Sequence, residues 1–267
     1  MTLDQKLSSL ANPSIGFIQN IRIAESAFAG LTFANGCVVT PPAAAGSGLG
    51  ELPPMPVSGT GMGRIEALRR LMMEAVERNS SLYLGSEDLV RTYAGDASGV
   101  PLRELLVDAS IDPGQMIRMV SAKPIIGGNR RLIPAACVYM GYSAGDEPCY
   151  FVADSNGCAA AETKEDAVRR ALLEVIERDA FAIWWFNRVA RPALSFTDDS
   201  MLCEIATALR TEERTLVLMN ITNDIGVPVV AAYSADAKGS RIYLGCAADA
   251  CETVSYTHLT LPTNREV

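Results

Sequence analysis

Apolar and polar residues alternate along the chain with periods that predict three helices and several strands. Apolar side chains recur every three or four residues over 65–83, 164–185 and 200–210, which places them on one side of a helix. Shorter apolar runs predict strands, and these cover residues 15–18, 37–39, 136–140, 216–219, 229–233 and 241–245. Because helices and strands are mixed without strict alternation, we expect an α+β, or loosely mixed α/β, fold.

Two segments depart from these patterns. Residues 41–63 are rich in Pro, Gly and Ala, which predicts a loop and no core element. Residues 254–267 turn abruptly to a polar segment that resembles translated sequencing-adapter sequence; a genuine polar tail is the alternative. We therefore expect one domain over 1–253, incomplete at its C-terminus, and a non-native tail over 254–267. On this interpretation the chain is a truncation of a longer protein, and an inactive fragment is one of the alternatives.

Composition and charge exclude several classes of function. Hydrophobic residues make up 49% of the chain and charged residues 20%, as in folded globular proteins. The net charge is -8 and no run of Lys or Arg is present, which argues against nucleic-acid binding. The first residues do not have the order of a signal peptide, and no apolar stretch is long enough to span a bilayer. We expect a cytoplasmic protein without a membrane partner.

The supply of reactive side chains narrows the chemistry further. The seven cysteines are scattered without a CxxC pair, which argues against a disulfide framework. His258 is the only histidine, so a Ser-His-Asp triad or a histidine-based metal site would depend on that residue alone. Carboxylates, arginines, amides and hydroxyls are left as the candidate groups.

An internal repeat is the most informative feature of the sequence. Residues 66–78 match residues 166–178 at a uniform offset of one hundred, and each copy contains the pattern ExxER. The charged residues of these patterns are Glu74, Glu77 and Arg78 in the first copy and Glu174, Glu177 and Arg178 in the second. On a helix they form one stripe over roughly a third of the circumference, and apolar residues fill most of the remainder. The repeat implies duplicated architecture.

The charged stripe has two interpretations. It is either a solvated surface with Glu–Arg pairs at i, i+4, each worth about 0.2–0.5 kcal/mol, or a buried set of carboxylates that needs a cation. The wide apolar arc, the duplication, and the apolar Phe181, Trp184 and Trp185 after the second copy favour burial. Oxygen ligands without His or Cys suit Mg²⁺, and arginines beside the metal suit a polyphosphate.

A turn signal precedes the second helix at residues 154–159. The Ser155 hydroxyl, the Asn156 amide and free backbone N–H groups can cradle an anion there. An ordinary β-turn is the alternative. The chain has no GxxxxGK[ST] pattern, which excludes the P-loop class.

Taken together, these motifs resemble the YcaO-like family. The two ExxER helices, the Ser-Asn-Gly turn at 155–157, the apolar continuation at 184–187 and the strand-turn-strand pattern at 220–229 appear in the family's order, and the resemblance covers about residues 55–253. It implies a YcaO-like fold with duplicated helix-strand units around a nucleotide site. It further implies ATP and Mg²⁺ as cofactors: Glu74, Glu77, Glu174 and Glu177 would bind the metal, and Arg78, Arg178, Ser155 and Asn156 would complete the nucleotide site.

The resemblance also implies an activity. The family phosphorylates the oxygen of a peptide backbone amide and so drives azoline-type cyclodehydration in the biosynthesis of ribosomal peptides such as thiazole/oxazole-modified bacteriocins. The implied partners are a precursor peptide, a leader-peptide-binding protein and a second copy of the chain as a homodimer. Another backbone modification, such as thioamidation, is an alternative product.

Two departures from the family pattern keep other interpretations open. Arg70 stands where the family usually has Ser, and the family's third helix with Glu and Gln is not found, so no catalytic base is assigned. A non-catalytic family member that binds a peptide or a partner is therefore an alternative. A purely structural, duplicated α+β domain with exposed charge stripes is another.

Overall fold

The computed structural model describes residues 5, 9, 17–25, 31–39, 54–85, 87–96, 112–142, 146–147 and 150–250 of the 267-residue chain. The chain divides into two compact units. Unit 1 comprises Met1–Ile21, Gly36–Val57 and Met72–Ala160, and unit 2 comprises Arg22–Asn35, Ser58–Leu71 and Ala161–Val267. The expected non-native tail over 254–267, with His258, lies outside the described residues.

A three-stranded sheet forms the first part of the fold, with strand order β1-β2-β3. The strands are β1 (Ile18–Glu25), β2 (Leu31–Val38) and β3 (Met55–Met62), and helix α2 (Arg64–Ser80) follows. The predicted helix over 65–83 is thus confirmed, with an earlier end. The predicted loop over 41–63 is wrong for residues 55–62, which form β3; residues 41–53 lie outside the described part.

The glycines of β3 explain why sequence patterning missed this strand. Val57, Gly59 and Gly61 alternate as buried positions along β3, but glycine carries no apolar side chain to signal that side. A Cβ atom on Gly59 would overlap the carbonyl oxygen of Ala67 and the backbone nitrogen of Leu71. Glycine therefore lets β3 approach the backbone of α2 directly.

Unit 1 contains a second antiparallel sheet of order β4-β5-β6, namely β4 (Leu89–Tyr93), β5 (Met116–Ala122) and β6 (Arg131–Pro134). Short 3-10 helices follow β4 and β6, at η2 (Ala94–Asp96) and η3 (Ala135–Cys137). Its core centres on Ala94, Ile117 and Met119.

The strand predicted at 136–140 is wrong. The backbone N–H groups of Val138 and Tyr139 both donate to the carbonyl oxygen of Ala135 at 3.0 Å, so the chain turns directly after β6. Ala135 and Ala136 are buried in this turn. A short apolar run records burial, but it does not distinguish a strand from a buried turn.

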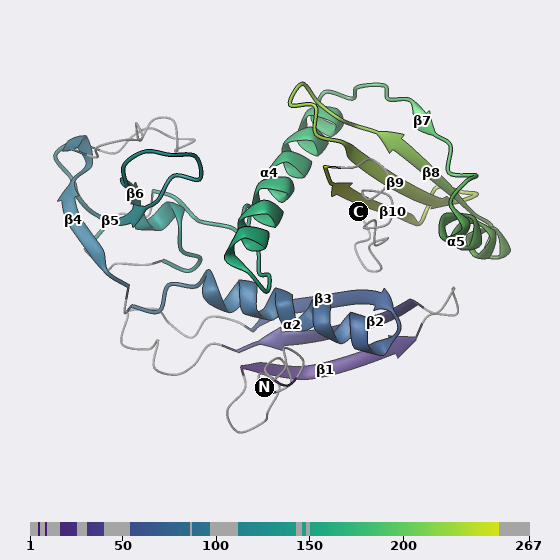
Figure 1. Cartoon of the computed structure of the whole chain (residues 1–267), viewed down its shortest axis with the longest axis horizontal. Helices are drawn as coiled ribbons and strands as arrows, with labels where there is room; N and C mark the ends of the chain where they lie inside the picture. Colours follow the sequence, from purple (N-terminus) through teal and green to yellow (C-terminus); the bar gives the residue numbers. More distant parts are fainter. Residues whose placement is uncertain are drawn as a thin grey trace. The chain divides into compact units, whose positions relative to one another are not determined.

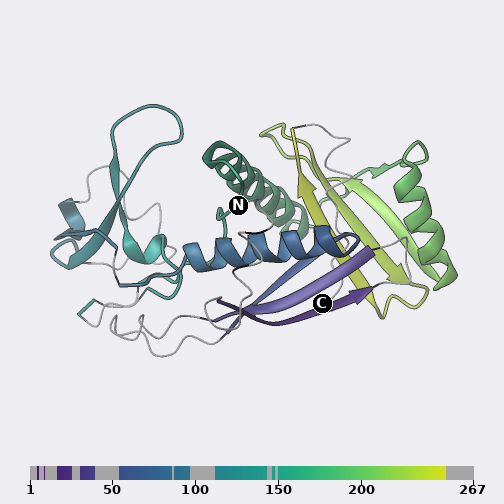
Figure 2. The same ribbon diagram turned by 60° about the horizontal axis from the view of Figure 1, so that its bottom comes forward.

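Unit 2 is built on an antiparallel four-stranded sheet of order β10-β9-β8-β7. Its strands are β7 (Ala193–Leu194), β8 (Arg214–Asn220), β9 (Val229–Asp236) and β10 (Ile242–Ala248). Helix α4 (Lys164–Phe186) covers one face and α5 (Ser200–Thr211) the other (Figures 1 and 2). The strands and helices predicted for 164–245 are therefore confirmed, and so is the mixed α+β class.

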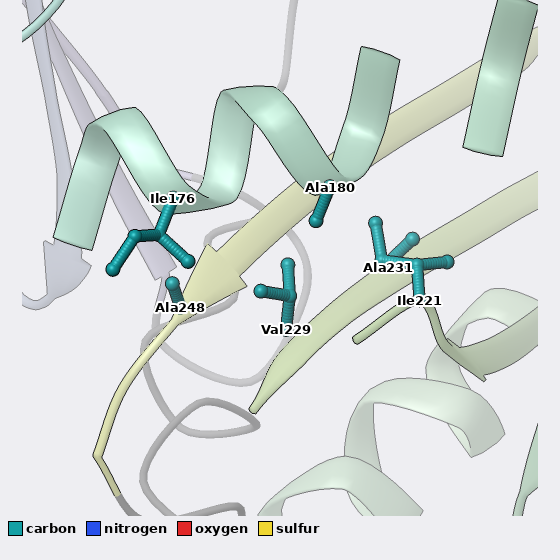
Figure 3. Packing of buried hydrophobic residues seen from close by; sticks show 6 residues of the cluster. All are labelled: Ile176, Ala180, Ile221, Val229, Ala231 and Ala248. Carbon is teal, nitrogen blue, oxygen red and sulfur yellow. The ribbon is translucent and has the colours of Figure 1, made fainter. Parts of the chain in front are cut away.

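Strand β9 shows how the two faces are shared. Val229 and Ala231 pack with Ile176 and Ala180 of α4 (Figure 3). Val230 and Ala232 point to the opposite face and pack with Leu202 of α5, among others. This alternation with a period of two buries β9 on both faces. Among the described residues, no helix is long and apolar enough to cross a membrane.

Candidate functional site

Helix α4 carries the second ExxER copy in a fixed orientation. The helix begins after Thr163, whose Oγ1 accepts a hydrogen bond from the backbone N–H of Asp166 at 3.1 Å. The burial of Ile176 and Ala180 against the sheet sets the rotation of the helix about its axis. Arg178 donates to Glu174 Oε1 from both Nε, at 3.0 Å, and Nη2, at 2.8 Å. The i, i+4 pairing expected from the sequence is therefore present.

Glu177, on the same helix, lies next to β10. Burial raises the pKa of Glu177 to about 7; the charge of Arg178 and a hydrogen bond with the Ala248 backbone oppose this rise, while the charge of Glu174 adds to it. Burial, with the charge of Glu177 as a further cause, also raises the pKa of the Cys246 thiol on β10 to about 12. Near neutral pH the carboxylate of Glu177 is thus only partly ionised, and a bound cation would favour its ionised form.

Helix α2 carries the first ExxER copy. Arg78 Nη2 lies 3.3 Å from Glu74 Oε1, and Glu77 is half-buried. The Nε atom of Arg78 is buried and has no hydrogen-bond partner in the part of the chain that the structure describes. Buried donors normally have an acceptor, so this guanidinium group retains capacity to bind an anionic oxygen.

The predicted turn before α4 is confirmed. The backbone N–H of Cys158 donates to the carbonyl oxygen of Ser155 at 3.0 Å, and Gly157 has a positive φ of 75°. Asn156 donates to the Asp154 carboxylate from its backbone N–H and from Nδ2, each at 2.8 Å. Asp154 is not among the predicted site residues, although an Asp that accepts from the backbone N–H two residues later is a known signal for a turn. The amide that the resemblance assigns to a nucleotide is bound to Asp154 in this conformation.

The predicted site residues divide between the two units. Glu74, Glu77, Arg78, Ser155 and Asn156 belong to unit 1. Glu174, Glu177 and Arg178 belong to unit 2. Within the described ranges, no group of three or more His, Cys, Asp or Glu residues is placed to hold a metal ion. Each helix by itself offers a pair of glutamates, and the site of four glutamates stays a prediction.

Arg70, which departs from the family pattern, is part of the start of α2. Its Nη2 lies 2.6 Å from Glu66 Oε1, and Glu66 Oε2 accepts a hydrogen bond from the backbone N–H of Met62 at 2.8 Å. The side chains of Arg70 and Glu66 are 40% and 41% exposed. Arg70 therefore supports the end of β3 and the first turn of α2 through Glu66.

One contact beside the second ExxER copy was missed by sequence reasoning. Nδ2 of Asn223, in the connection from β8 to β9, donates to Asp179 Oδ2 at 2.7 Å. Oδ1 of Asn223 accepts from the backbone N–H of Ile225 at 3.1 Å. The contact spans 44 residues of sequence, and no local signal indicates it. It ties the β8–β9 connection to α4 at the residue after Arg178.

Asn223→Ala is expected to lower the free energy of unfolding by about 1 kcal/mol, because it removes a hydrogen bond to a charged group at a partly exposed position. Urea unfolding of the variant measures the loss. Asp224→Asn, at the exposed neighbouring position, is the control and should leave stability unchanged. A double-mutant cycle with Asp179→Ala tests the contact itself, and a coupling energy of zero would contradict it.

Two observations test whether these residues suit Mg²⁺ and a polyphosphate. Glu177 is a half-buried carboxylate whose raised pKa is only partly offset by the charge of Arg178, so a cation nearby would stabilise its ionised form. Arg78 has a buried donor without an acceptor among the described residues. Paired glutamates are suitable oxygen ligands for Mg²⁺, and arginine is suited to phosphate. The residues present therefore fit both groups.

Comparison with known proteins gives a family match. A family model described as YcaO cyclodehydratase, ATP- and Mg²⁺-binding, matches residues 58–254. An uncharacterized protein of Methanothermobacter thermautotrophicus is 28% identical over 183 residues, which cover 67% of this chain and 48% of that protein. A Rhizobium leguminosarum bv. trifolii protein, described as an uncharacterized protein in the tfuA 3' region, is 28% identical over 139 residues, or 47% of this chain and 33% of that protein. The chain thus spans half or less of the length of these relatives.

Solved structures show the same fold. A heterocyclase in complex with substrate and cofactor has a TM-score of 0.81 and 22% identity, over 94% of this chain and 38% of that one. YcaO from Methanopyrus kandleri, bound with AMPPCP and Mg²⁺, has a TM-score of 0.73 and 20% identity, over 98% of this chain and 65% of that one. The heterocyclase TruD has a TM-score of 0.63 and 24% identity, over 74% of this chain and 33% of that one. The fold expected from the resemblance is therefore confirmed.

Proposed function

The chain belongs to the YcaO family, and we propose that it uses ATP and Mg²⁺ to activate a peptide backbone amide for azoline-type cyclodehydration. The observation that carries this proposal is Glu177 in the second ExxER copy: burial raises the pKa of its carboxyl to about 7, and a bound cation would favour the ionised form. An amide oxygen is a poor leaving group. A side-chain nucleophile of the peptide would add to the amide carbon, and the resulting oxygen would take the γ-phosphoryl group of ATP with release of ADP. Phosphate would then leave as the C=N bond of the ring forms, and bound Mg²⁺ would neutralise charge during the transfer.

The side chains divide the task by their chemistry. Glu74, Glu77, Glu174 and Glu177 would hold Mg²⁺ through carboxylate oxygens. Arg78 and Arg178 each keep one of these glutamates in position through the i, i+4 pair, and the buried Nε of Arg78 is available to a phosphate oxygen. Ser155 and Asn156 would donate to the nucleotide, which requires Asn156 to release Asp154. Positive charge at the transferred group stabilises the charge that develops there.

The peptide context follows from the same proposal. We propose a precursor peptide as substrate and a separate leader-binding protein as partner, in the cytoplasm. A solved structure of the same fold, described as a heterocyclase in complex with substrate and cofactor, is consistent with a separate substrate molecule.

Nucleotide binding by the full chain tests the proposal. Titration of AMPPCP with Mg²⁺, followed by calorimetry, should show binding that Mg²⁺ strengthens. Glu77→Gln and Glu174→Gln should each weaken binding about 10- to 100-fold, because each removes a charged ligand. Glu165→Gln, at an exposed position in the first turn of α4, is the matched control and should bind as the original chain does. Equal binding by all three variants would contradict the proposed site.

Arg70 supports a second candidate function, a family member that binds nucleotide or peptide without turnover. Its guanidinium group, bound to Glu66, stands where the family usually has a serine. Arg70→Ser separates the two candidates by the rate of ATP consumption in the presence of peptide. An increase from an undetectable rate would favour the non-catalytic function for the natural chain, and measurable consumption before the change would exclude it.

A further inference from the structure

A segment of unit 1 is basic although the chain as a whole is acidic. Residues 113–145 contain no Asp or Glu but four cations, Arg118, Lys123, Arg130 and Arg131, in a chain with a net charge of -8. Arg118 is paired with Asp146 at 2.7 Å and with the buried Glu147 at 2.9 Å. Lys123 and Arg130 are the first and last residues of the connection between β5 and β6, and Arg131 is the first residue of β6. Positive charge is thus concentrated on one hairpin.

The same connection exposes two adjacent isoleucines. Ile125 is 68% exposed and Ile126 is 89% exposed, and the residues from Gly127 to Arg130 are exposed as well. Figure 2 shows the connection as an open loop that extends beyond the strands β5 and β6. Single exposed apolar residues are common, but two β-branched side chains side by side at the end of a hairpin do not stabilise the fold of the unit that carries them.

The base of the loop is held by one hydrogen bond. Nη1 of Arg130 donates across the base to the carbonyl oxygen of Ser121 at 3.3 Å. Gly127 and Gly128 form the turn of the loop, with positive φ values of 28° and 116°. Proline restricts the backbone before the isoleucines, and isoleucine has few side-chain rotamers, so covering Ile125 and Ile126 costs less entropy than covering longer, flexible side chains.

We infer that this isoleucine loop, residues 123–130, is a docking surface for an acidic peptide segment that carries aliphatic side chains. The aliphatic side chains would cover Ile125 and Ile126, and the carboxylates would face Lys123 and Arg130. This inference stands apart from the nucleotide site and does not depend on the proposed function.

Charge favours a peptide over a membrane as the occupant. An anionic bilayer is an extended surface, and it would repel the rest of a chain with a net charge of -8. A peptide segment approaches the basic loop alone. Strand β4 begins at Leu89, opposite Val120 of β5, so the register places Asp88 near the base of the loop. The loop therefore presents cations, without an acidic side chain of its own, to an acidic partner.

Isoleucine-methyl NMR on the full chain tests the inference with three defined probes. These are a synthetic peptide of alternating Glu and Leu, its Lys/Leu counterpart, and phosphatidylglycerol vesicles. The Glu/Leu peptide should shift the δ1 methyl signals of Ile125 and Ile126, which single Ile→Val substitutions assign, and the shift should weaken as salt is added. Ile65 on α2 is 75% exposed and supplies an internal control whose signal should not move.

Variants of the loop make the test quantitative. The double change Ile125→Ser and Ile126→Ser should weaken binding of the Glu/Leu peptide at least 10-fold, as should Lys123→Glu with Arg130→Glu. Ile65→Ser is the matched control and should bind as the original chain does. Because the replaced isoleucines are exposed, the remaining methyl signals should keep their positions, which verifies folding. Equal shifts by the Lys/Leu peptide, equal shifts at Ile65, or a response of the loop to vesicles alone would each overturn the inference.

Discussion

Replacement of Glu177 by Gln is expected to make the metal-free protein more stable at pH 8 and, if the proposed function holds, to remove Mg²⁺-dependent nucleotide turnover. Glutamine keeps the size of the side chain and loses only the ionisable group. Burial raises the pKa of the Glu177 carboxyl to about 7, whereas the same group in the unfolded chain titrates at about 4.3. The folded protein therefore holds a proton at Glu177 that the unfolded chain has already released.

The sign of the pH dependence follows from this difference in bound protons. As the pH rises from about 4 to about 7, the unfolded chain is stabilised by ionisation of Glu177 while the folded chain is not, so the free energy of unfolding falls. Above pH 7 the loss is complete and amounts to at most about 4 kcal/mol. Glu177→Gln removes this loss, so the gain in stability appears fully at pH 8 and disappears near pH 4.

Urea unfolding at pH 4, 6 and 8, with EDTA present, measures the stability arm of this prediction. Glu165→Gln, at an exposed position on the same helix, should show no such pH-dependent gain. Mg²⁺ with AMPPCP should stabilise the original chain at pH 8, because a ligand that binds only the folded state raises stability, and should have little effect on Glu177→Gln.

The rate of ATP consumption is the second measurement for Glu177→Gln. Loss of a charged ligand should lower Mg²⁺-dependent ATP consumption by about 100-fold or more. A variant that is less stable than the original at pH 8 would show that Glu177 is ionised and well compensated in the fold, and would contradict the argument from burial. If both the stability at pH 8 and the ATP consumption of Glu177→Gln were lower than in the original chain, the argument from burial would be contradicted as well.

The sequence predicts elements of this fold well where side chains with a clear period form them. Helix α4 was expected over 164–185, and its bounds in the structure are Lys164–Phe186. The strand expected over 229–233 is the start of β9, whose side chains pack against α4 and α5 in turn. Strand β3 is not predicted from the sequence because its buried positions are largely glycines. The strand predicted at 136–140 is wrong because burial of apolar residues alone does not specify a strand.

The candidate site shows the same limit. The pairs Glu74–Arg78 and Glu174–Arg178 follow from i, i+4 spacing on a helix, and the sequence is sufficient to predict them. The raised pKa of Glu177 depends on its burial beside β10, a strand more than sixty residues further along the chain. Spacing on one helix has no information about a strand that packs against it later.

Gly59→Ala is expected to destabilise the protein by about 3 kcal/mol, the upper range of overpacking, because the new methyl group meets backbone atoms that have no rotamer with which to yield. The atoms in question are the Ala67 carbonyl oxygen and the Leu71 nitrogen, which belong to the hydrogen-bonded core of α2. To accept the methyl group, β3 must move away from the helix. Thermal and urea unfolding of the full chain measure the loss.

Neighbouring positions provide a graded series for this prediction. At Gly61 a Cβ atom would lie 2.7 Å from Cβ and Cγ of Glu66 and 2.8 Å from the Ala67 nitrogen, so part of the contact is with a side chain that can shift. Gly61→Ala should therefore cost less than Gly59→Ala, and Thr60→Ala, which adds no atom, should cost least. Equal losses at 59 and 60 would show that β3 does not lie against α2 at Gly59. The series measures how closely β3 packs against α2, the helix of the first ExxER copy. Gly59→Ala should weaken Mg²⁺–AMPPCP binding only if the movement of β3 also shifts Glu74 on α2.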